Sequence, residues 1–178
     1  MVAEKDLYEP IKRILCLNFR AVFDDCFLAT TSEGIFPDKI LSQVHKDDEI
    51  IFYFLKKKNS PDLTGFVKVV TKTEPKPSPL QEWFKSENAA YHFITVEVKN
   101  DTIGLEDIYQ AKRYSDLFKA KYGLLISTRL IPTPIKRLCE RIPILDTARK
   151  EKLRLGQFDG GDIINWFPES PFTTRLLL

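Results

Sequence analysis

The chain has 178 residues, of which 43% are hydrophobic and 29% charged, so a single globular domain with a sizeable core is expected. Its net charge of +2 is too small to indicate nucleic-acid binding by itself, although several lysines and arginines are clustered. Three widely spaced cysteines and the lack of a long apolar run argue against a zinc site, a disulfide framework and a membrane partner, so we expect a cytoplasmic protein.

The first third of the chain begins with an expected amphipathic helix over residues 4–19. Leu7, Ile11 and Leu15 recur there at helical spacing. A strand is expected over residues 22–31, because an apolar run there ends at a Ser-Glu-Gly turn signal.

The middle of the chain is read as strands separated by turns and an insertion. An apolar stretch at residues 49–55 runs into lysines and a turn at 59–62. Strands are expected over 63–71 and 91–99, and the proline-rich segment between them, about 73–90, is expected to be an irregular insertion.

After the second of these strands, helices and strands alternate. A helix is expected over residues 105–121, followed by a strand over 122–128 whose nearly continuous apolar sequence indicates burial on both faces. Thr133 is expected to be the N-cap of a helix that ends near residue 141. A further strand is expected over 152–158.

This order of elements predicts an α/β fold with a mixed central sheet flanked by helices. We expect one domain over residues 1–178, with a core at about 4–141 that contains the insertion at 73–90. Residues 142–178 form an expected C-terminal extension.

The strand over residues 91–99 ends in an unusual way for an apolar strand. Glu97 and Lys99 lie on one face, and Val96 and Val98 lie on the other, because strand side chains alternate. Desolvating charged groups is costly, and a bound metal ion would explain the presence of both. Alone, however, a Glu-x-Lys triplet is most often found on a solvated strand edge.

A second carboxylate could come from either of two Pro-Asp pairs, which contain Asp38 and Asp62. Such a pair is most often only a turn. We prefer Asp62, because it opens the strand that precedes the Glu97 strand, so that the two carboxylates can converge across a hairpin.

Three motifs in this order resemble the PD-(D/E)xK nuclease superfamily, in particular its RecB-type members. The residues that carry the resemblance are Pro61-Asp62, Glu97-Val98-Lys99 and Gln110-x-x-x-Tyr114. The resemblance covers about residues 4–141 and implies a restriction-endonuclease-like core.

The resemblance also implies a function: metal-dependent hydrolysis of phosphodiester bonds, with DNA favoured as substrate and Mg²⁺ or Mn²⁺ as cofactor. A hard divalent cation with oxygen ligands lowers the pKa of bound water and acts as a Lewis acid. The implied metal ligands are Asp62, Glu97 and the carbonyl of Val98. The other implied catalytic residues are Lys99, Gln110 and Tyr114.

Several alternatives stay open at this point. Glu4 resembles an additional acid of the family but is equally consistent with an ordinary helix-start carboxylate, and Glu9 is a weaker candidate. The protein could instead be a catalytically weak or inactive nuclease-fold subunit that binds nucleic acid or assembles with others. A protein-interaction module would be indicated if the Glu97 strand were a solvated edge. The apolar C-terminus at residues 175–178 could cap the core or join a homodimer.

Overall fold

The computed structural model describes residues 3–44, 59–70 and 89–172. The apolar stretch at 49–55 and nearly all of the insertion predicted at 73–90 lie outside these ranges, as does the C-terminus at 175–178. The elements in chain order are α1 (Glu4–Arg20), β1 (Asp25–Thr30), α2 (Asp38–Leu41), β2 (Leu63–Val70), β3 (Ala89–Lys99), α4 (Leu105–Leu117), β4 (Tyr122–Ser127), α5 (Thr133–Arg141), β5 (Arg154–Phe158) and β6 (Ile163–Phe167).

The strands form one mixed sheet in the order β1-β2-β3-β4-β5-β6, which confirms the predicted mixed α/β class. Strands β1, β2 and β3 are antiparallel neighbours, whereas β4 and β5 run parallel to β3. The parallel step from β3 to β4 is made by the crossover helix α4, as parallel neighbours require. Strand β6 closes the sheet antiparallel to β5.

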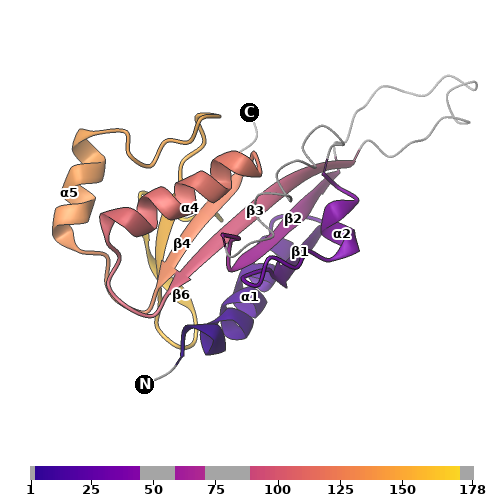
Figure 1. The fold of residues 1–178 in the computed structure, drawn as a ribbon, viewed down its shortest axis with the longest axis horizontal. Helices are drawn as coiled ribbons and strands as arrows, with labels where there is room; N and C mark the ends of the chain where they lie inside the picture. Colours follow the sequence, from indigo (N-terminus) through magenta and orange to yellow (C-terminus); the bar gives the residue numbers. More distant parts are fainter. Residues whose placement is uncertain (1–2, 45–58, 71–88, 173–178) are drawn as a thin grey trace, which may run out of the picture.

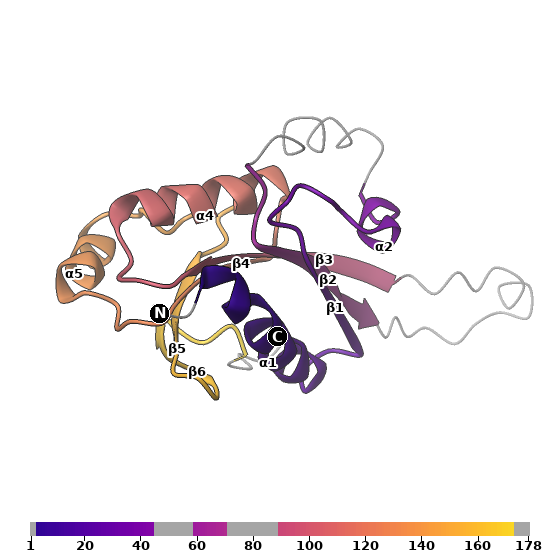
Figure 2. The same cartoon turned by 60° about the horizontal axis from the view of Figure 1, so that its bottom comes forward.

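Helices cover both faces of this sheet. Helix α1 lies on one face, and α2 and α4 lie on the other (Figure 1 and Figure 2). Alternation along β3 divides its side chains between the two layers: Val96 and Val98 pack in the core on the α1 side, while Glu97 contacts Gln110 of α4. The predicted separation of the charged and apolar faces of this strand is therefore confirmed.

Two helix boundaries differ from the sequence-based expectation. Helix α4 ends at Leu117 instead of residue 121, and Lys119 then adopts a left-handed conformation with φ of 49° that redirects the chain into β4. Helix α5 starts one residue earlier than predicted: Thr133 is its first residue, and Pro132, in extended conformation, is the N-cap.

The C-terminal segment adds to the sheet. The predicted strand at 152–158 appears as β5 beside β4, and β6 was not predicted, because Ile163–Phe167 has no clear alternation of apolar and polar residues. None of the helices in the described ranges is both long enough and apolar enough to cross a lipid bilayer.

Candidate functional site

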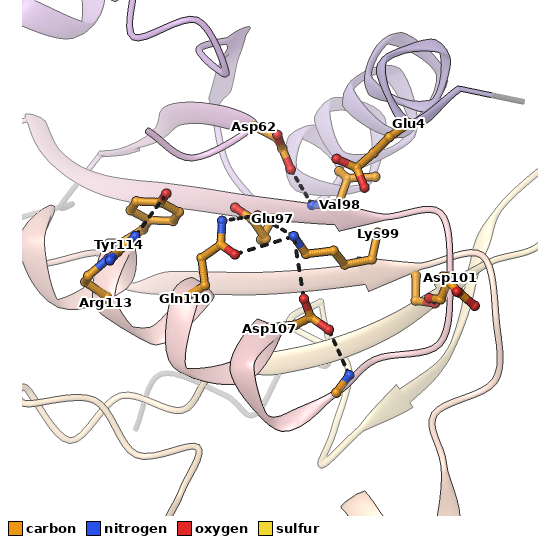
Figure 3. Close-up of polar contacts among 12 residues, drawn as sticks. Glu4, Asp62, Glu97, Val98, Lys99, Asp101, Asp107, Gln110, Arg113 and Tyr114 are labelled. Carbon is orange, nitrogen blue, oxygen red and sulfur yellow. Dashed lines mark hydrogen bonds and ion pairs between the residues drawn. The ribbon is translucent and has the colours of Figure 1, made fainter. Parts of the chain in front are cut away.

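The pairing of β2 with β3 brings the predicted site residues together. Leu63 pairs with Val96, so the residue before β2, Asp62, lies next to Glu97 and Val98 at the end of the hairpin. The Val98 N–H donates to Asp62 Oδ2 over 2.7 Å (Figure 3). The structure thus brings Asp62 to the Glu97 strand, whereas Asp38 is the first residue of α2, and the role of Asp62 as a metal ligand stays a prediction.

The Asp62 carboxylate is almost completely enclosed, with 7% of the residue exposed. Its Oδ1 accepts a hydrogen bond of 2.6 Å from the hydroxyl of Tyr8 in α1. Burial raises the pKa of Asp62, and the hydrogen bonds from Tyr8 and Val98 offset this only in part. A buried carboxylate that accepts two hydrogen bonds can be ionised, and a nearby positive charge would stabilise its ionised form further.

Glu97 is the most unusual group of the site. It is 3% exposed, and its Oε1 accepts from Lys99 Nζ at 3.0 Å and from Gln110 Nε2 at 2.6 Å. Its Oε2 is buried and has no hydrogen-bond partner among the described residues. Burial, together with the charge of Asp62, raises the pKa of Glu97 to about 8, although Lys99 acts in the opposite direction.

Lys99 is held by groups from β3 and from α4. Besides Glu97, its Nζ lies 3.5 Å from Gln110 Oε1 and 3.6 Å from Asp107 Oδ1. Burial by itself would lower the pKa of Lys99, but the charges of Glu97 and Asp107 outweigh it and raise that pKa. Lys99 therefore remains a cation at neutral pH.

The two predicted residues of α4 have different environments. Gln110 contacts both Glu97 and Lys99, and a catalytic role for it stays a prediction. Tyr114 is 2% exposed and packs in the core cluster that contains Ile40 and Phe66, and its hydroxyl accepts from Arg113 at 3.3 Å. A role for Tyr114 at the reaction centre stays a prediction, while its packing role is clear.

The candidate acids on α1 also separate. Glu4 begins the helix, its Oε1 lies 3.5 Å from the Tyr8 hydroxyl, and its charge contributes to the raised pKa values of Asp62 and Glu97. Glu9 instead forms an exposed ion pair of 2.6 Å with Lys12. Glu4 is thus the better candidate for an additional acid.

Sequence reasoning missed two residues of the site, Tyr8 and Asp107. Tyr8 lies four residues after Glu4 and hence on the same helix face, a spacing that could have indicated it. By sequence, Asp107 is only an acid suited to the start of α4. Its Oδ2 does accept from the Gly104 N–H at 2.8 Å, but its other oxygen faces Lys99.

The chemistry of these donors fits a hard divalent cation. Within the described ranges, no three His, Cys, Asp or Glu side chains lie close enough together to hold a metal ion. Mg²⁺, however, commonly uses only one or two carboxylates and keeps several waters. Asp62 and the unpaired Oε2 of Glu97 supply such a pair, and coordination by the Val98 carbonyl stays a prediction.

The hydrogen bond from Tyr8 to Asp62 leads to a first prediction. Tyr8→Phe, which removes only the hydroxyl, should lower the free energy of unfolding by about 1–2 kcal/mol, because Asp62 keeps its burial but loses a short bond. Urea denaturation at neutral pH measures this change, with Tyr91→Phe as a control on a more exposed tyrosine. An unchanged free energy for Tyr8→Phe would show that the bond contributes no net stability.

Comparison with known proteins identifies a family. The sequence model of the EVE domain matches residues 37–137, more than half of the chain. The chain belongs to the EVE domain family. This family is PUA-like and related to YTH and ASCH domains, which is a different fold family from PD-(D/E)xK, and the match does not support the nuclease resemblance.

The EVE match runs from the residue before α2 into α5 and therefore includes Asp62, Glu97, Lys99 and Gln110. It does not include α1, so Glu4 and Tyr8 lie outside the matched EVE segment. No curated protein and no solved structure matches the chain.

Proposed function

We propose that this protein binds nucleic acid and hydrolyses its phosphodiester bonds with the help of Mg²⁺ or Mn²⁺. DNA is the favoured substrate. The observation that carries the proposal is the buried, unpaired Oε2 of Glu97 beside the second buried carboxylate, Asp62. Burial raises the pKa values of both carboxyl groups, and their ionised forms repel each other. A divalent cation bound between them would relieve that repulsion.

Each side chain of the site has a role in this proposal. Asp62 and Glu97 would hold the ion, which when bound supplies an activated water and a Lewis acid. Gln110 and Lys99 both bind Oε1 of Glu97, which fixes the carboxylate so that Oε2 is left for the ion. Lys99, a cation at neutral pH, would stabilise the negative charge that develops on the phosphate oxygens.

We also propose that the core is restriction-endonuclease-like. The order of α1, three antiparallel strands, the crossover helix α4 and the parallel strand β4 supports this. So does the placement of Asp62 before β2, of Glu97 and Lys99 in β3, and of Gln110 in α4.

The test is an assay on linear, single-stranded, branched and plasmid DNA and on RNA, with Mg²⁺, Mn²⁺ or EDTA. We expect cleavage only with metal, and we expect Asp62→Asn and Glu97→Gln to lose it, because each removes one ligand charge at nearly constant volume. Cleavage by both variants at the rate of the parent would overturn the assignment.

A second candidate is a nucleic-acid-binding or assembly subunit that does not use the site catalytically. Membership of the EVE family favours it, because PUA-like domains bind nucleic acids. Calorimetric titration with Mn²⁺ separates the two. Binding that is lost in Asp62→Asn and Glu97→Gln supports the catalytic site, and nucleic-acid binding without any such metal binding supports the second candidate.

A further inference from the structure

A groove beside α4 shares Gln110 with the candidate site. It has a volume of about 360 Å³ and is lined by Asn59, Glu106, Tyr109, Gln110 and Arg113. Gln110 belongs to both places, because it lines the groove and donates to Glu97 over 2.6 Å. A ligand in this groove would therefore contact Gln110, the residue that holds Oε1 of Glu97.

Tyr109 gives the groove a flat aromatic surface. The residue is 49% exposed, whereas Ile108, Ala111 and Tyr114 of the same helix are buried in the core. A tyrosine presents a large ring at low cost in side-chain entropy, and every nucleobase can stack on such a ring.

Arg113 lies one helical turn after Tyr109, so both point from the same side of α4. Its guanidinium is oriented by the protein: it donates to the Tyr114 hydroxyl at 3.3 Å and lies 5.0 Å from the centre of the Tyr114 ring. The groove thus combines an exposed ring, on which a base can stack, with an oriented cation, which can bind a phosphate.

We infer that this groove binds an unpaired nucleic-acid strand, with a base stacked on Tyr109 and a neighbouring phosphate on Arg113. The inference rests on the proposed function and specifies its substrate as single-stranded DNA or a frayed end. In a duplex, both faces of an internal base are covered by its neighbours, so a tyrosine ring reaches only unpaired or terminal bases.

The ring and the cation of the groove contribute differently to binding. Among the described residues that line it, Glu106 and Arg113 carry opposite charges. Stacking on Tyr109 distinguishes an unpaired strand from a duplex, and Arg113 contributes one phosphate contact to both. Arg113→Gln should therefore reduce the slope of log K against log salt by the amount expected for about one neutralised phosphate.

The experiment measures binding of a short fluorescein-labelled single strand, and of the blunt duplex of the same sequence, by anisotropy in EDTA. Tyr109→Ala should weaken single-strand binding roughly fivefold or more, which corresponds to the loss of one stacked base. Tyr109→Phe, which keeps the ring, should bind like the parent. Leu105→Ala, another exposed position on α4, is the matched control.

The outcomes separate this inference from the proposed function. Equal single-strand binding by the parent and Tyr109→Ala overturns the groove but leaves the proposed function standing. An equal loss of single-strand and duplex binding in Tyr109→Ala overturns the preference for unpaired strands. If the parent binds neither nucleic acid in EDTA but cleaves DNA with Mg²⁺, the groove inference fails and the proposed function stands; if it also fails to cleave with metal, both fail. Circular dichroism of each variant establishes that it is folded, and Tyr109→Phe provides the comparison that preserves the ring.

Discussion

Lys99→Met should reduce the rate of DNA cleavage by about 10²–10³-fold, the usual cost of removing one group that stabilises transition-state charge. Methionine retains most of the length of the side chain but removes the cation that lies 3.0 Å from Glu97 Oε1. Both proposed ligands, Asp62 and Glu97, remain. We therefore expect Mn²⁺ to bind still, while catalysis is lost.

The same substitution should move Mn²⁺ binding to higher pH. Lys99 lowers the pKa of Glu97, so without it the carboxyl holds its proton to higher pH and competes longer with the ion. Titration calorimetry at several pH values measures this shift. Lys112→Met, which removes a lysine elsewhere on α4, should change neither cleavage nor the pH dependence, and cleavage by Lys99→Met at the parent rate would rule out the proposed role.

The second large effect concerns the stability of the metal-free protein. Because folding raises the pKa of Glu97 from 4.5 to about 8, the folded state binds more protons than the unfolded state between these values. Stability is then highest below the unfolded pKa and is lost as the pH rises through the folded pKa. The difference between about pH 5 and about pH 9 should be on the order of a few kcal/mol, as expected for shifts of this kind.

Glu97→Gln should remove most of this pH dependence and make the metal-free protein more stable at alkaline pH. Glutamine fills nearly the same volume without the cost of a buried charge. Mn²⁺ should stabilise the parent against urea but leave Glu97→Gln unaffected, because only the parent has the ligand. Glu140→Gln, at an exposed position of α5, serves as the control. A parent whose stability rises steadily between these pH values would contradict the raised pKa.

The fold and the centre of the site could be predicted where the sequence signal was local. The turn at Pro61-Asp62 and the pairing of the predicted strands β2 and β3 place Asp62 beside Glu97, and the helical spacing of α4 places Gln110 next to Glu97. Tyr8 was missed because a tyrosine among the apolar residues of an amphipathic helix is usually a core residue. Its bond to Asp62 joins positions 54 residues apart, and no local pattern reports such a contact.

The nuclease resemblance and the EVE match rest on different amounts of sequence. The resemblance to nucleases depended on a few side chains around one site, whereas the EVE match follows the sequence over residues 37–137. Tyr114 illustrates how a motif can combine different roles. It completes the Gln110 motif by spacing, yet its ring fills the core on the α4 side of the sheet.

The antiparallel register of β2 and β3 has a practical consequence. The pair runs from Leu63 opposite Val96, next to the site, to Val70 opposite Ala89, seven residues farther along. At about 3.3 Å per residue, the chain between Val70 and Ala89 is attached roughly 23 Å from the carboxylates. A peptide attached at this end of the β2–β3 pair would therefore lie far from the Asp62–Val98 contact, which makes the position a suitable attachment point for a foreign targeting peptide.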